Sequence, residues 1–181
     1  MIILGIDPGT IVTGYGVISV SGRTKIALVE TGTIESAQRD AMPKRLAKIF
    51  SSLEAIISRT SPDVCAIESV FIDKNVQSIL KLGQARGVAI VAAETAGVEV
   101  SEYAPRVVKK AVTGNGNASK SQVEFMVRRL LALGSETDHR ADAFDALAIA
   151  IAHSLRQSGG ARAASSWKQF LEANPERIKQ R

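Results

Sequence analysis

The sequence predicts an α/β protein built on a mixed five-stranded sheet with helices on both faces. Three observations lead to this fold class. The chain begins with three short β-rich segments that are separated by turns. Helical segments then alternate with two further short apolar runs. The remaining segments have helical spacing, and we find no internal repeat.

The first three segments predict an antiparallel meander of strands. Residues 1–7 form a short apolar run that a Pro-Gly turn closes. Residues 13–20 and 25–34 predict two more strands, and the segment between them is short enough for a hairpin. A helix over 43–59 follows, because its apolar residues recur at spacings of three and four and Pro43 lies near its first turn.

The second half alternates strands with helices. Residues 64–67 are continuously apolar, which is typical of a strand buried on both faces in parallel pairing, and this run ends at Glu68. The chain then predicts a helix rich in alanine and glycine, a strand and three more helices, over 75–96, 98–103, 105–114, 120–133 and 139–155. The composition becomes linker-like beyond about residue 157. We therefore expect one domain over 1–156 and a basic, flexible tail over 157–181.

Composition limits the possible classes of protein. The net charge of +5 is consistent with a polyanionic partner and equally with an ordinary basic protein, and +3 of it lies from Gly160 onward. Cys65 is the only cysteine, so an intrachain disulfide is excluded. No basic region precedes the first apolar run, and no apolar stretch could span a bilayer. We expect a cytoplasmic protein without a membrane partner.

Four acidic residues occupy positions where a carboxylate needs a partner. Asp7 and Glu68 each end an apolar strand, and parallel neighbouring strands would bring them to one sheet edge about 4.8 Å apart. Asp142 and Asp145 share one face at the start of a helix that is apolar nearly all round. Carboxylates this close repel unless a cation lies between them. The four acids therefore predict a site for Mg²⁺ or Mn²⁺, and a pair of such ions can cleave a phosphodiester.

Each acid alone also has an ordinary structural explanation. Asp7 could cap the turn that follows it, and Glu68 could pair with a lysine. Asp142 and Asp145 could be first-turn acids that the helix dipole favours. Their combination on two strand ends and one buried helix favours the metal site.

Five motifs in this chain resemble those of the RuvC family of Holliday-junction resolvases in order and spacing, over residues 2–156. They are GIDPGT, TGYGVI, AIESVF, KLGQARGVAI and DAFDALAIAIAH. The resemblance implies an RNase H-like fold and a homodimer that nicks a four-way DNA junction symmetrically in recombination and repair. It implies that the four acids bind two Mg²⁺ ions, with Mn²⁺ able to substitute. It also implies a dimer contact through the helix over 75–96 and a branch-migration helicase complex as partner.

The resemblance also implies residues that contact DNA. Phe71 matches a family aromatic that stacks on bases at the junction centre, although a core position would equally explain a phenylalanine. Lys109 and Lys120 match lysines near the scissile phosphate, which places Lys120 in the catalytic set; the alternative is a solvated surface lysine. Arg106 and Lys110 share a helix face with Lys109, and a phosphate backbone would offset their repulsion.

A histidine near Asp142 is a further candidate for a metal ligand. Some relatives carry a histidine at the place of Asp142, and His139 lies close by in the sequence. A histidine at a helix start can instead be a solvated or capping residue, so the sequence leaves its role open.

Three other functions stay open from the sequence. GIDPGT is also similar to the first phosphate loop of actin-like ATPases and sugar kinases, but those need a second domain and a second Asp-x-Gly loop, which this chain lacks. A non-catalytic junction-binding module would need the basic surface and Phe71 but not four acids. A ribonuclease H would use the same metal site, and only the motifs outside that site favour junctions.

Overall fold

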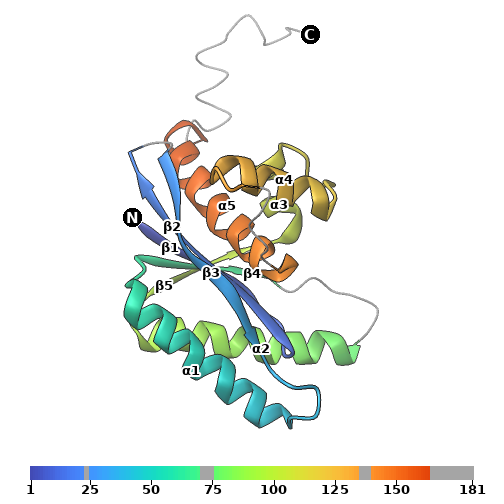
Figure 1. Cartoon of the computed structure of the whole chain (residues 1–181). Coiled ribbons are helices and arrows are strands. Elements are labelled where there is room, and N and C mark those ends of the chain that lie inside the picture. The colour runs from blue at the N-terminus through green and yellow to red at the C-terminus, as the bar shows by residue number, and fades with distance from the viewer. Residues whose placement is uncertain (23–24, 70–75, 135–139, 164–181) are drawn as a thin grey trace, which may run out of the picture.

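The structure is a computed structural model that describes residues 1–22, 25–69, 76–134 and 140–163, with side chains up to residue 157. The described residues form a five-stranded sheet between two layers of helices, as the sequence predicts (Figure 1). The strands are β1 (Ile2–Asp7), β2 (Val12–Ser21), β3 (Lys25–Glu35), β4 (Val64–Glu68) and β5 (Glu99–Tyr103). The helices are α1 (Met42–Thr60), α2 (Val76–Thr95), α3 (Pro105–Thr113), α4 (Lys120–Leu130) and α5 (Ala141–Ala163).

The strands lie in the order β3-β2-β1-β4-β5. β1 pairs antiparallel with β2, and β2 pairs antiparallel with β3, so the predicted meander is confirmed. β4 pairs in parallel with both β1 and β5. β1 and β4 are therefore parallel neighbours, and both end at the same edge of the sheet.

Both faces of the central strands are buried. Ile3 and Ala66 belong to a core that α3, α4 and α5 cover, and Leu4 and Cys65 belong to a second core beneath α1 and α2 (Figure 1). This double coverage explains why the β4 segment is apolar without alternation. The ends of the strands are the places where polar side chains can leave this apolar centre.

Two helices end at positions that differ from the prediction. α5 continues to Ala163, so the linker-like conformation expected for 157–163 is wrong. The first turns of α5 pack against the sheet and form the nucleus of the helix. Each further residue, glycine included, then adds a backbone hydrogen bond at a modest cost in free energy. α4 ends earlier than predicted because Ala132 has φ 52° and turns the chain. The boundary between domain and tail falls inside α5 and stays a prediction, and residues 164–181 lie outside the described part.

Glycines let α5 approach the sheet closely. A Cβ at Gly5 of β1 would stand 2.1 Å from the carbonyl oxygen of Ala146, and one at Gly14 of β2 would stand 2.0 Å from that of Asp142. Real side chains cannot occupy that space, so these positions need glycine for close approach and not for an unusual backbone angle. The first turns of α5 consequently lie directly over the ends of β1 and β2.

Replacing Gly5 by alanine should destabilise the protein by about 1–3 kcal/mol, because the added methyl group must push the α5 backbone away from β1. Urea unfolding followed by circular dichroism measures the change. Ser58→Ala, on the exposed side of α1, is the control and should alter stability by less than about 0.5 kcal/mol. Equal effects of the two changes would contradict the close-packing argument.

Candidate active site

The turn after β1 holds Asp7 at the sheet edge. Thr13 is fully buried, and its hydroxyl donates to the carbonyl oxygen of Gly9 at 2.7 Å. The N–H of Gly9 lies 3.3 Å from the same hydroxyl oxygen. A Cβ at Gly9 would stand 2.1 Å from the carbonyl oxygen of Val12, so the turn is too tight for another residue. The chain therefore reverses immediately after the carboxylate.

Three elements bring the four predicted acids toward this edge. β1 and β4 are parallel and in register, so their last residues, Asp7 and Glu68, leave the sheet side by side. On the other side of β1, the backbone of Asp142 lies against Gly14 of β2. Asp145 follows about one helical turn later on α5.

Three of the acids and two of the predicted lysines line one cavity of about 230 Å³. Its polar side chains are those of Asp7, Glu68, Asp145, Lys109 and Lys120, and its other lining residues are Pro105, Val108, Val123 and Ala148. The sequence pattern did not predict this apolar wall, although the wall belongs to the buried faces of α3, α4 and α5. Asp142 does not line the cavity, but its charge still acts on Asp7.

Burial and crowding favour the neutral form of Asp7. Burial is the largest influence, and the charges of the other three acids add to it, Glu68 most strongly, so the pKa of Asp7 rises to about 8. The pKa of Glu68 is also raised, first by burial and then by the charge of Asp145, whereas the two lysines lower it. The cluster therefore holds more potential negative charge than its lysines balance.

α4 begins at Lys120 and presents this lysine to the acids. Ser119 caps the helix, since its hydroxyl accepts from the N–H of Gln122 at 3.2 Å and its own N–H donates to the Gln122 side chain at 2.9 Å. The Nζ of Lys120 donates to Oδ2 of Asp145 at 2.9 Å. This hydrogen bond is the main cause that raises the pKa of Lys120, so the ammonium stays charged. No sequence motif predicted this ion pair.

The chemistry of the four acids suits a hard divalent cation. Carboxylate oxygens are ligands that Mg²⁺ and Mn²⁺ prefer, and a cation would relieve the repulsion that raises the pKa of Asp7. Within the described residues, however, no three carboxylate, histidine or cysteine side chains stand close enough together to hold a metal ion. The donor types therefore fit a metal site, while Asp145 is turned toward Lys120.

The other predicted residues lie away from the cavity or outside the described part. Arg106 packs against the loop between α3 and α4, and Lys110 is exposed. Of the three cations expected on one face of α3, Lys109 is the one that lines the cavity. Phe71 and His139 lie outside the described residues.

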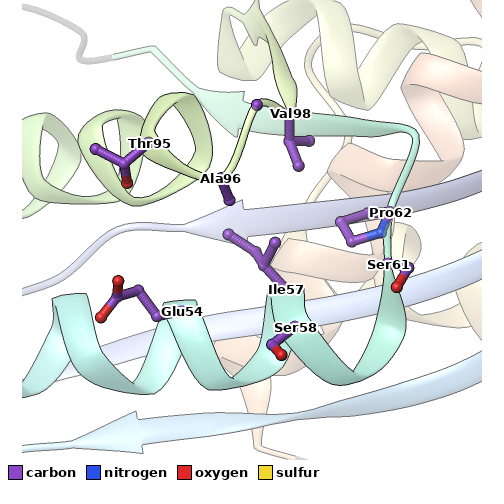
Figure 2. A pocket seen from close by; sticks show the side chains of 9 residues that line it. Glu54, Ile57, Ser58, Ser61, Pro62, Thr95, Ala96 and Val98 are labelled. Atoms are coloured by element: carbon purple, nitrogen blue, oxygen red, sulfur yellow. The ribbon is translucent and has the colours of Figure 1, made fainter.

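A larger cavity away from the four acids has one ionisable side chain in its lining. Figure 2 shows this cavity of about 520 Å³ where α1 and α2 end, with Glu54 as its ionisable side chain. A lone carboxylate has no partner there for acid–base work. Cys65 is buried and burial raises its pKa to about 12, which makes it a poor nucleophile. In the described part of the chain, no helix has the length and apolarity needed to cross a membrane.

Comparison with known proteins agrees with this fold. The family described as crossover junction endodeoxyribonuclease RuvC matches residues 3–153. Proteins of that name from Cytophaga hutchinsonii and Actinobacillus succinogenes are 42% and 54% identical, over 98% and 87% of this chain and 88% and 82% of their own.

Solved structures give the same result. The structure of Thermus thermophilus RuvC in complex with a Holliday junction substrate superposes with a TM-score of 0.83 at 34% identity, over 88% of this chain and 96% of its own. The expected RNase H-like fold is therefore confirmed. The chain belongs to the RuvC family of crossover junction endodeoxyribonucleases.

Proposed function

We propose that this chain is a metal-dependent endonuclease that resolves four-way DNA junctions by paired symmetric nicks in recombination and repair. The observation that carries the proposal is the cavity in which Asp7, Glu68 and Asp145 meet Lys109 and Lys120 in a chain of this family. The complex of the Thermus relative with a Holliday junction supports the choice of substrate.

We propose Asp7, Glu68, Asp142 and Asp145 as the ligands of Mg²⁺, with two ions in each site and Mn²⁺ able to substitute. The ions, when bound, would supply an activated water and charge to stabilise the leaving oxygen. The raised pKa of Asp7 supports the assignment, because a crowded carboxylate that resists ionisation gains most from a nearby cation.

The two lysines of the cavity would hold the scissile phosphate beside the acids. Lys120 is anchored by Asp145 and keeps its charge, so it can contact a phosphate oxygen without leaving the cavity mouth. Lys109 lines the same space from α3. The apolar wall that includes Val108 and Val123 excludes water from one side, which strengthens these charge interactions.

Further DNA contacts would extend from this cavity. Arg106 and Lys110 are exposed on α3, the helix that carries Lys109, so a phosphate backbone held at Lys109 would also meet their positive charge. We also propose that Phe71 stacks on unpaired bases at the junction centre, as the family resemblance implies.

A second copy of the chain would pack on α1 and α2. A hollow of about 420 Å³ lies between these helices, lined by Leu46, Ala47, Phe50, Gly83, Gln84, Gly87, Val88 and Val91. Leu80 and Val91 of α2 expose 63% and 52% of their surface, which favours a covered interface over open solvent. We propose this face as the homodimer contact, and a branch-migration helicase complex as a further partner on family membership alone.

Asp7→Asn should reduce nicking of a labelled synthetic four-way junction by at least about 100-fold, because the metal site loses a charged ligand. Junction binding without metal should remain, since the lysines are unchanged. The assay compares Mg²⁺ with EDTA and includes linear duplex and an RNA–DNA hybrid.

Asp40→Asn is the matched control, because Asp40 pairs with Lys44 of α1 and does not line the acidic cavity, so this variant should nick normally. Full nicking by Asp7→Asn would overturn the ligand assignment. Cleavage of the hybrid in place of the junction would instead identify a ribonuclease with the same fold.

Metal-free protein should lose stability as the pH rises from about 4 to about 8, because folded Asp7 keeps its proton up to about pH 8 and an unfolded aspartate releases it near 3.8. The folded state then binds more protons than the unfolded state, so a rising pH favours unfolding. Asp7→Asn should reduce this loss. Urea unfolding in EDTA at pH 5 and pH 8 measures it, and identical pH dependence in both proteins would refute the crowding of Asp7.

Lys110→Gln should weaken junction binding and reduce the slope of log K against log salt concentration by about 1, because one phosphate contact is lost. Lys25→Gln is the control, since Lys25 begins β3 at the opposite end of the sheet from Asp7. Fluorescence anisotropy from low to moderate salt gives both slopes. An unchanged slope for Lys110→Gln would remove Lys110 from the DNA surface.

A further inference from the structure

A partly buried hydrogen bond joins α5 to the edge strand β5. The Oη of Tyr103 lies 2.8 Å from Nδ1 of His153, and their rings meet edge to face with centroids 5.8 Å apart. His153 is only 3% exposed, and the guanidinium of Arg156 lies 5.9 Å from the centre of the Tyr103 ring. Neither Tyr103 nor His153 lines the acidic cavity.

Tyr103 connects this bond to Glu68. It is the last residue of β5 and pairs in register with Glu68, the last residue of β4. Its carbonyl oxygen also accepts from the N–H of Ser69 at 2.9 Å. The backbone around Glu68 is thus hydrogen-bonded to that of Tyr103.

His153 connects the same bond to Asp145. Both residues belong to α5, separated by two helical turns that are buried throughout. On the β1 side, close contact at Gly5 sets the distance between sheet and helix. On the β5 side, the Tyr103–His153 hydrogen bond joins the helix to the strand beside Glu68.

A histidine is a costly choice at this core position. Its Nε2 is buried and has no hydrogen-bond partner in the described residues, whereas an apolar side chain would bring no polar atom of its own into the core. Burial also lowers the pKa of His153, so the ring is neutral at pH 7 and can bond the tyrosine hydroxyl without a counterion. Departures of this kind from good core composition concentrate at functional sites.

We propose that Tyr103 and His153 are positioning residues whose hydrogen bond holds Glu68 at a set distance from Asp145 and so tunes the affinity of the acids for their divalent cation. The inference rests on the metal site proposed above. It assigns these two side chains no contact with the metal or with DNA.

Tyr103→Phe removes the hydroxyl and keeps the ring. Tyr15→Phe is a matched control at the chain's other tyrosine, whose hydroxyl bonds Glu30 at 2.8 Å on the β2–β3 side of the sheet. Calorimetric titration of each full-length protein with Mn²⁺, without DNA, gives the dissociation constant, and nicking assays give the half-saturating Mg²⁺ concentration.

Tyr103→Phe should raise both metal constants about fivefold, which is the lower end of the usual coupling between two separate sites, with metal-free junction binding unchanged. Tyr15→Phe should leave both constants within about twofold, because its hydroxyl serves a different contact. His153→Leu should act like Tyr103→Phe, and the double variant should be no worse than either single variant, since all three remove the same bond.

The outcomes separate this inference from the proposed function. A lower melting temperature in Tyr103→Phe with both metal constants unchanged would reduce the pair to a stabilising contact and overturn the inference, while the nuclease assignment would stand. Additive effects in the double variant would also overturn it. Failure of the unaltered protein to bind Mn²⁺ or to nick a junction would overturn both proposals.

Discussion

The close contact between α5 and the glycine-bearing strands β1 and β2 is the constraint on which the rest of the structure depends. A side chain at Gly5 or Gly14 would occupy the space of the helix backbone, so these positions decide how deeply α5 lies. That depth places the acids of α5 beside the strand ends that carry Asp7 and Glu68. Packing of small residues thus comes first, and the charged site is a consequence of it.

The charge balance of the site explains its chemistry. The same packing that gathers the acids also buries them, which is why burial exceeds the neighbouring charges as the cause of the high pKa of Asp7. Lys120, at the helix start that Ser119 caps, offsets part of the repulsion among the acids by donating a hydrogen bond to Asp145. A site that is short of positive charge is suited to a divalent cation, which the proposed function requires, and a cation bound there would in turn attract a phosphate.

Several features of the molecule could be predicted from residues alone. The ends of apolar runs located Asp7 and Glu68 at one sheet edge, since parallel strands that are both buried must expose their polar residues where they end. Spacing placed Asp142 and Asp145 on one helix face. Periodicity did not predict where α5 stops, because helix extension beyond a packed core depends on cooperative backbone bonding more than on composition.

The sequence by itself determined the family and the order of the elements and predicted which acids form the site, because motifs and hydrophobic periodicity are properties of neighbouring residues. Tertiary structure alone decided that Lys109 faces the cavity while Arg106 and Lys110 do not, and that Lys120 pairs with Asp145. It also decided that Tyr103 meets His153 across 50 residues of chain. Such contacts depend on the distances at which packed elements settle, and those distances follow from side-chain volumes summed over the whole core.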